Sequence, residues 1–204
     1  MEVIDDIVFI AAADCTGHGV PGAFMSMITS TLFKEIAYQY EITDPASFLY
    51  KLDELLKNTL HKSDKSSVHD GLDLSICIFD LATNYVSFSG AYRPILIYKN
   101  KTLEQIKTSH FSIGGDDFIE KEFITFGEQL QKDDIVYLFT DGFPDQFGGE
   151  NGKKLYLKGF MSLIENSVDL NMDEQHLLLL HFLKDWKGDR KQVDDVLVMG
   201  IKIS

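Results

Sequence analysis

The sequence predicts an α+β protein in which helices pack on sheets of neighbouring strands. An apolar strand-like run is followed by two helical stretches, then by a group of strand-like segments, two more helical stretches and a last strand-like run. Such clustering favours a layered α+β architecture over the regular alternation of an α/β fold. The 204 residues contain no linker rich in proline, glycine or serine, so we expect a single domain over residues 1–204.

The N-terminal elements follow from periodicity and from capping residues. Residues 7–13 form a short apolar run that suits a buried strand. Residues 21–40 begin with a proline and place apolar side chains on one helical face. Asp44 and Pro45 are an N-cap and first-turn pair, which predicts a second helix reaching residue 61. The polar residues 61–71 are predicted to form a loop.

The remaining strand-like segments are short, rich in β-forming residues and bounded by turn signals. They cover residues 72–79, 85–89, 95–98, 135–139 and 196–203. Helical periodicity predicts helices over residues 155–168 and 173–186.

The composition excludes several classes of function. Lysine and arginine number 19 and aspartate and glutamate 32, so the net charge is −13. That balance lacks the basic footprint needed to bind nucleic acid or an anionic membrane surface. No apolar run approaches the length of a membrane-spanning helix, and the acidic N-terminus is unlike a secretory signal. Cys15 and Cys77 are the only cysteines, which favours a reducing, cytoplasmic compartment.

Aspartates stand at the ends of three apolar strands. Asp14 ends the first run and opens a glycine-rich turn, Asp141 ends another, and Asp194 and Asp195 precede the last. Charges at the ends of buried strands are costly unless paired or ligated, and adjacent carboxylates repel each other. A divalent cation relieves both costs, and all-oxygen ligands favour Mg²⁺ or Mn²⁺. Taken singly, each aspartate also fits an ordinary strand-end or cap position.

The glycine-rich turn has a second interpretation. Gly17, Gly19 and Gly22 match the dinucleotide-binding pattern G-x-G-x-x-G between a strand and a helix. Asp14 would bring negative charge towards the pyrophosphate, so a dinucleotide-binding domain is the less favoured alternative. Cys15 has no evident base partner, which argues against a thiol nucleophile.

The turn also belongs to a longer series of motifs. Residues 14–27 read DCTGHGVPGAFMSM, residues 90–94 GAYRP, residues 137–149 YLFTDGFPDQFGG, residues 186–188 WKG and residues 192–201 QVDDVLVMGI. In this order they resemble bacterial metal-dependent protein serine/threonine phosphatases of the SpoIIE-like branch of the PPM, or type 2C, superfamily. The resemblance covers nearly the whole chain.

The resemblance implies a four-layer α-β-β-α sandwich that binds two Mn²⁺ or Mg²⁺ ions. Asp14 and the Cys15 backbone carbonyl would be metal ligands, together with Asp141 and Asp194. A metal-activated water would hydrolyse phosphoserine or phosphothreonine on a signalling protein, such as an anti-sigma-factor antagonist. The resemblance is also compatible with a homodimer, with an upstream sensor domain in a longer protein, and with a catalytically degenerate regulatory or dimerisation module.

Two departures from the family pattern qualify these expectations. The family carries a further metal aspartate in a Gly-Asp motif on a strand before the Asp14 strand, and the chain begins after that position. Asp5 and Asp6 are expected to lie in a hairpin turn and not to replace it. We therefore expect an N-terminally truncated domain that lacks its first strand and one ligand, with weak metal binding and low or absent activity. Eukaryotic members place a histidine where this chain has Thr16.

Three more residues are candidates for supporting roles. His18 could act as an acid or pack within the turn. Arg93 could contact phosphate, because a guanidinium suits a dianion, or it could be a solvated turn residue. Asp195 could contact substrate or support the metal ligands.

Overall fold

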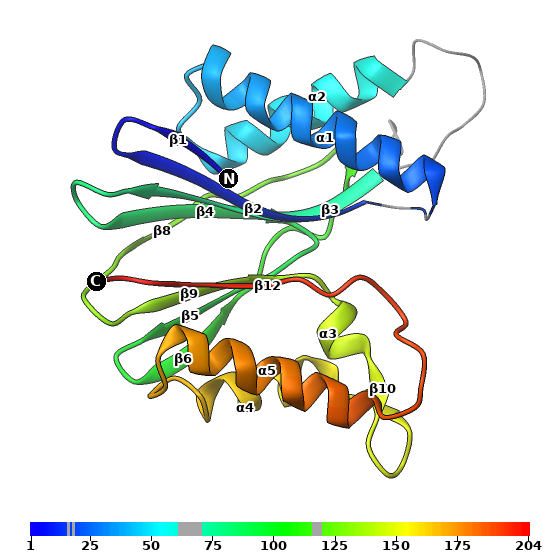
Figure 1. Cartoon of the computed structure of the whole chain (residues 1–204). Coiled ribbons are helices and arrows are strands. Elements are labelled where there is room, and N and C mark those ends of the chain that lie inside the picture. The colour runs from blue at the N-terminus through cyan, green and yellow to red at the C-terminus, as the bar shows by residue number, and fades with distance from the viewer. Residues whose placement is uncertain (16, 18, 61–70, 116–119) are drawn as a thin grey trace. The chain divides into compact units, whose positions relative to one another are not determined.

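The computed structural model describes residues 1–15, 17, 19–60, 71–115 and 120–204, and its internal contacts divide the chain into two compact units. Unit 1 comprises Met1–Pro94 and Lys107–Gln131, and unit 2 comprises Ile95–Ile106 and Lys132–Ser204. Figure 1 shows that helices and a sheet contribute to each unit.

The unit 1 sheet has the strand order β1-β2-β3-β4-β8, and β7 pairs with β3. These strands are β1 (Glu2–Ile4), β2 (Ile7–Cys15), β3 (Gly71–Asp80), β4 (Tyr85–Ala91), β7 (Ile113–Gly114) and β8 (Phe126–Gln129). Every one of these pairs is antiparallel. A dinucleotide-binding fold requires a mostly parallel sheet, so this topology disagrees with the alternative interpretation of the glycine-rich turn.

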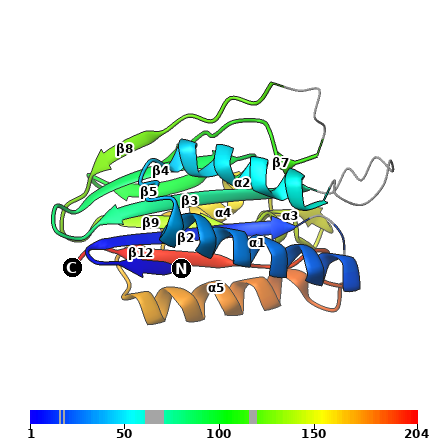
Figure 2. The same cartoon turned by 90° about the horizontal axis from the view of Figure 1, so that it is seen from above.

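Two helices cover one face of the unit 1 sheet, as Figures 1 and 2 show. They are α1 (Val20–Gln39) and α2 (Pro45–Leu60), in close agreement with the predicted helices. Asp44 caps α2, because its Oδ2 accepts a hydrogen bond of 2.8 Å from the Ser47 backbone N–H. The core under these helices includes Ile36, Phe48 and Leu52, which are fully buried. Burial of each such side chain stabilises the unit by about 1.5–3 kcal/mol.

The hairpin at the start of unit 1 agrees with its predicted turn. Asp5 and Asp6 connect β1 to β2, and Asp5 has a φ of 51°. We expected the chain to lack the strand before the Asp14 strand, but three residues of such a strand are present as β1, which pairs with β2 and contains no Gly-Asp pair.

The unit 2 sheet has the strand order β12-β9-β5-β6, again with antiparallel pairs. These strands are β5 (Ile95–Lys99), β6 (Thr102–Ile106), β9 (Ile135–Phe139) and β12 (Val198–Lys202). The helices are α3 (Gly142–Asp145), α4 (Tyr156–Glu165) and α5 (Met172–Lys187), and β10 (Phe147–Gly148) pairs with β11 (Lys153–Lys154). α4 and α5 pack on the sheet around the buried Tyr137, Phe143 and Phe160.

These elements confirm the predicted α+β class, with helices packed on antiparallel sheets in both units. The predicted loop at residues 61–71 lies almost entirely outside the described residues, and Gly71 already belongs to β3. Within the described part of the chain, no helix combines the length and apolar character required to cross a membrane.

Candidate functional site

Asp14 lies near the end of β2 and belongs to a cluster of charged side chains in unit 1. It is directly opposite Asp73 of β3 in the antiparallel register. The Arg93 guanidinium joins the two carboxylates, since its Nη2 lies 2.8 Å from Asp14 Oδ2 and 3.5 Å from Asp73 Oδ2. Ser112 Oγ donates a 2.5 Å hydrogen bond to Asp73 Oδ1. We call Asp14, Asp73, Arg93 and Ser112 the Asp14 cluster.

The backbone holds Arg93 in a tight turn. Tyr92 has a φ of 66°, in the left-handed region, and the Arg93 N–H donates to the Ala91 carbonyl at 2.8 Å. The Arg93 carbonyl accepts a 3.0 Å hydrogen bond from Thr108 Oγ1. A Cβ at Gly90 would lie only 2.5 Å from the Arg93 oxygen, so this position requires glycine. Because the Arg93 side chain is only 14% exposed and ion-paired, it is not a solvated turn residue.

The glycine-rich turn after β2 is also explained by its backbone. Gly17 and Gly19 have φ values of 95° and 69°, which favour glycine. A Cβ at Gly22 would lie 2.6 Å from the Gly17 carbonyl oxygen, so the first turn of α1 packs closely on this loop. Cys15 is the last residue of β2. Thr16 and His18 lie outside the described residues.

Unit 2 holds the other predicted ligands. Asp141 is the second residue after β9, and Asp194 lies in the segment that leads into β12. A carboxylate oxygen of Asp141 and one of Asp194 lie within 4.8 Å of each other. Asp194 Oδ1 accepts a 2.8 Å hydrogen bond from the Asp195 backbone N–H. The structure therefore places Asp141 and Asp194, which the family resemblance names as metal ligands, close to each other.

Thr140 fixes the segment that carries Asp194 and Asp195. Its hydroxyl donates to the Asp195 carbonyl at 2.9 Å and accepts from the Leu197 N–H at 3.0 Å. Gly142 lets this segment approach α3, because a Cβ there would lie 2.2 Å from the Asp195 oxygen. Asp195 thus supports the segment through its backbone.

Gln146 holds the same segment from its other end. The side chain is fully buried, its Nε2 donates to the Lys191 carbonyl at 3.1 Å, and its Oε1 accepts from the Val193 N–H at 3.3 Å. Trp186 Nε1 of α5 donates to the Gln146 carbonyl at 2.9 Å. We call Thr140, Asp141, Gln146, Asp194 and Asp195 the Asp141 cluster.

Sequence reasoning missed Asp73, Ser112, Thr140 and Gln146 as parts of these clusters. Thr140 and Gln146 gave a weak signal, because each is a polar residue that directly follows or precedes a phenylalanine in the motif of residues 137–149. Asp73 gave a similar signal near the start of an apolar strand, whereas Ser112 lies in a polar segment without any pattern.

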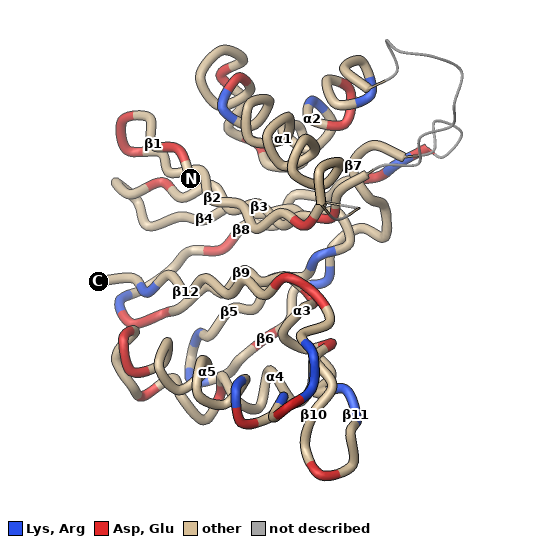
Figure 3. Tube along the Cα trace, turned by 45° about the vertical axis from the view of Figure 1, so that its right-hand side comes forward, with Lys and Arg blue, Asp and Glu red and all other residues tan. Residues whose placement is uncertain are grey.

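Figure 3 shows acidic positions at the β1–β2 turn and beside α3.

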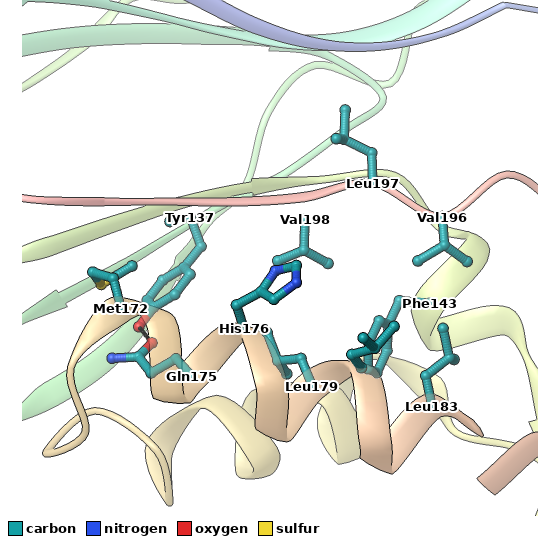
Figure 4. Close-up of a pocket in the computed structure, with 12 residues that line it drawn as sticks. Tyr137, Phe143, Met172, Gln175, His176, Leu179, Leu183, Val196, Leu197 and Val198 are labelled. Carbon is teal, nitrogen blue, oxygen red and sulfur yellow. Dashed lines mark hydrogen bonds between the residues drawn. The ribbon is translucent and has the colours of Figure 1, made fainter. Parts of the chain in front are cut away.

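Unit 2 also contains a pocket of about 370 Å³ between α5 and strands β9 and β12. Most of its lining is apolar, and Figure 4 shows Val196, Val198 and Leu179 facing it. At one end the Tyr137 hydroxyl donates a 2.8 Å hydrogen bond to Gln175 Oε1. Burial raises the pKa of Tyr137, so its hydroxyl stays protonated near neutral pH. The described lining residues include no carboxylate, so this pocket lacks the ligands that Mg²⁺ prefers.

The fold is that of PP2C phosphatase domains. The chain is similar to the SiaA-PP2C domain of Pseudomonas aeruginosa, with a TM-score of 0.88 and 24% identity, over 100% of this chain and 78% of that chain. It is also similar to the SpoIIE phosphatase domain with a fragment of the regulatory domain from Bacillus subtilis (TM-score 0.73, 20% identity, 99% of this chain and 55% of that chain). RsbX in complex with magnesium matches with a TM-score of 0.66 and 16% identity, over 98% of this chain and 83% of that chain.

At these identities, the structural matches establish the fold alone. The profile of the family described as Stage II sporulation protein E (SpoIIE) matches residues 5–204, and the chain belongs to this family. No curated protein matches the sequence.

Proposed function

We propose that this chain is the catalytic domain of a bacterial protein serine/threonine phosphatase that hydrolyses phosphoserine or phosphothreonine with a metal-activated water. The observation that carries this proposal is the proximity of Asp141 and Asp194, whose carboxylate oxygens lie within 4.8 Å of each other. Two carboxylates this close repel each other unless a cation or a proton is shared between them. Family membership and the PP2C fold support the same conclusion.

The donor set fits a hard divalent cation. We propose Asp141 and Asp194 as ligands in unit 2, and Asp14 with the Cys15 backbone carbonyl as ligands in unit 1. All of these donors are oxygens, which favours Mg²⁺ or Mn²⁺, and the similar RsbX structure holds magnesium. When bound, such a cation lowers the pKa of a coordinated water and neutralises phosphoryl oxygens.

The other residues of the chain would position these ligands. Thr140 and Gln146 fix the segment that presents Asp194, and Gly142 allows that segment to pack beside Asp141. Arg93 forms an ion pair with Asp14, and from this position its guanidinium could also bind a phosphoryl group. We retain His18 and Asp195 as candidates for substrate contact.

We propose a phosphorylated signalling protein, such as an anti-sigma-factor antagonist, as the substrate. A similar structure from Mycobacterium tuberculosis contains RsbU and RsbW domains together, which supports a role within a modular regulatory protein. We further propose a cytoplasmic location, a single domain over residues 1–204, an upstream sensor domain in the full-length protein, and homodimer formation.

The test is Mn²⁺-dependent hydrolysis of p-nitrophenyl phosphate and of a phosphoserine peptide. In a version of the chain extended upstream, we expect Asp14→Asn and Asp141→Asn to lower turnover by about a hundredfold or more, because each removes a ligand charge. Asp133→Asn is the matched control, since Asp133 pairs with Lys202 beside β9 and is not a proposed ligand. It should retain turnover within about twofold.

A version extended upstream to include a Gly-Asp strand separates this proposal from a degenerate regulatory module. We expect the extended protein to be the more active of the two, because it supplies the family's further metal aspartate. If the extended protein is inactive with Mn²⁺, or is unaffected by the two substitutions, the phosphatase proposal is wrong.

A further inference from the structure

One guanidinium serves two carboxylates in the Asp14 cluster. Asp14 and Asp73 face each other across the β2–β3 ladder, and Arg93 Nη2 is closer to Asp14 (2.8 Å) than to Asp73 (3.5 Å). All three side chains are largely buried, with exposed fractions between 14% and 23%. Like charges in such a site require a cation, and here Arg93 supplies one.

We propose that Arg93 is a positioning residue that holds the Asp14 carboxylate in the metal-free protein and transfers to Asp73 when a divalent cation binds Asp14. The proposal rests on the proposed function, because it takes Asp14 to be a metal ligand. It assigns to Asp73 the role of alternative partner for the guanidinium.

Asp73 is built to receive Arg93. Its Oδ1 is fixed by the 2.5 Å hydrogen bond from Ser112, and its Oδ2 already faces the guanidinium. The carboxylate therefore needs no rearrangement to accept a closer ion pair. The Arg93 backbone is held by Ala91 and Thr108, so the transfer requires a movement of the side chain alone.

The transfer also avoids an electrostatic penalty. The guanidinium stays charged at every relevant pH, and it would repel a second cation on the same carboxylate. An arginine left unpaired in this largely buried position would be costly. Asp73 removes that cost, since the guanidinium exchanges one carboxylate for another.

This arrangement predicts effects of opposite sign on metal affinity. Arg93→Met removes the competing cation and should tighten Mn²⁺ binding by about threefold or more. Asp73→Asn removes the alternative partner, keeps a hydrogen-bond acceptor for Ser112, and should weaken Mn²⁺ binding by about threefold or more. In the double variant Arg93→Met/Asp73→Asn, the Asp73 substitution should have little further effect.

The experiment is an electron paramagnetic resonance titration of the 204-residue chain with Mn²⁺ alone, extended to millimolar concentration. Lys202→Met is the control for removal of a positive charge, because Lys202 pairs with Asp133 in unit 2, and its Mn²⁺ affinity should equal that of the wild type. If the charges acted only additively, Asp73→Asn would weaken Mn²⁺ binding by the same factor in the wild type and in the Arg93→Met variant. That result would overturn the proposal. Weaker Mn²⁺ binding by the Arg93→Met variant than by the wild type would overturn the proposal as well.

The same titration distinguishes the two levels of inference. If wild-type binding is abolished by Asp14→Asn but the Arg93 and Asp73 variants do not show opposite signs, the transfer is wrong and the metal site stands. If the wild type binds no Mn²⁺ at millimolar concentration, or Asp14→Asn binds as well as the wild type, Asp14 is not a metal ligand in this chain and the transfer is wrong. The phosphatase proposal is then decided by the upstream-extended protein.

Discussion

The Asp14 and Asp141 clusters hold acidic side chains by different means. In the Asp14 cluster a positive charge holds the carboxylates, because Arg93 pairs with both Asp14 and Asp73. In the Asp141 cluster neutral groups hold the acidic segment, since Thr140 and Gln146 form hydrogen bonds with the backbone that carries Asp194. A charged partner can be displaced by another ion, whereas a backbone hydrogen bond fixes a segment whether or not an ion is present. The contrast indicates that the Asp14 cluster can exchange its charged partner for an ion, whereas the segment of the Asp141 cluster is held without one.

The largest effect is expected where the Asp141 cluster depends on close backbone packing. Gly142→Ala would place a Cβ 2.2 Å from the Asp195 oxygen, a contact that only movement of the backbone can relieve. We expect a loss of about 3 kcal/mol in the free energy of unfolding, at the upper end for overpacking, measured by urea denaturation. Unchanged stability would show that the segment before β12 is not rigid, which would weaken the comparison.

Removal of the neutral hydrogen bonds should have the next largest effect. Gln146→Leu leaves the Lys191 carbonyl and the Val193 N–H without this partner, at an expected cost of about 2 kcal/mol in the same assay. Gln129→Leu is the matched control, because Gln129 is exposed and donates to the Thr83 carbonyl. It should cost less than about 0.5 kcal/mol.

The stability of unit 1 should also fall when a buried charge outside the Asp14 cluster is removed. Lys121 is 8% exposed at its side chain and donates to Asp53 Oδ1 of α2 at 2.5 Å and to the Gly114 carbonyl. Burial lowers the pKa of Lys121, and the ion pair with Asp53 opposes that shift. Lys121→Met should cost about 1.5 kcal/mol, because it removes the hydrogen bonds to Asp53 Oδ1 and to the Gly114 carbonyl, while Lys57 still pairs with Asp53. The exposed pair of Lys202 with Asp133 provides the control, and Lys202→Met should cost less than about 0.5 kcal/mol.

The smallest effect concerns the cap of α2, and it carries a pH dependence. Burial raises the pKa of Asp44, but hydrogen bonds from Thr125 and Ser47 outweigh burial and hold the pKa below its ordinary value of 3.8. The stabilisation is therefore complete above pH 3.8 and is lost as the pH falls below that value, through the pKa of the folded state. Asp44→Ala should cost about 1 kcal/mol at neutral pH. Asp44→Asn should retain most of the capping and lose the pH-dependent part of the stabilisation. The measurement is thermal unfolding between pH 2 and pH 6, a range that brackets the ordinary aspartate pKa of about 3.9.

The sequence predicted those elements whose apolar residues repeat clearly. The boundaries of β2, β9, α1, α2 and α5 agree with the predicted ones to within two residues. It did not predict β6 or β8, whose sequences Thr-Leu-Glu-Gln-Ile and Phe-Gly-Glu-Gln are short and half polar. Such edge segments become strands through pairing with β5 and β4, and local propensity gives little sign of them.

The same limit applies to the candidate site. Motif order led us to propose Asp14, Asp141 and Asp194, and the proximity of Asp141 to Asp194 follows from the pairing of β9 with β12. The partners of Asp14 could not be predicted, because Asp73 and Arg93 are 59 and 79 residues further along the chain and approach it only through the β2–β3–β4 register. A pattern confined to one segment carries no information on such pairs.

The division of the chain into units has a consequence for biosynthesis. The β5–β6 hairpin of unit 2 is translated before β7 and β8 of unit 1, and β12 is made last of the described strands. As the chain leaves the ribosome, unit 1 is therefore complete at Gln131, when only the β5–β6 hairpin of unit 2 has been made, and unit 2 is complete only after β12. A single cut after Gln131 leaves unit 1 whole with the β5–β6 hairpin attached. Residues 132–204 expressed alone lack β5 and β6, so β9 should be left without its partner β5.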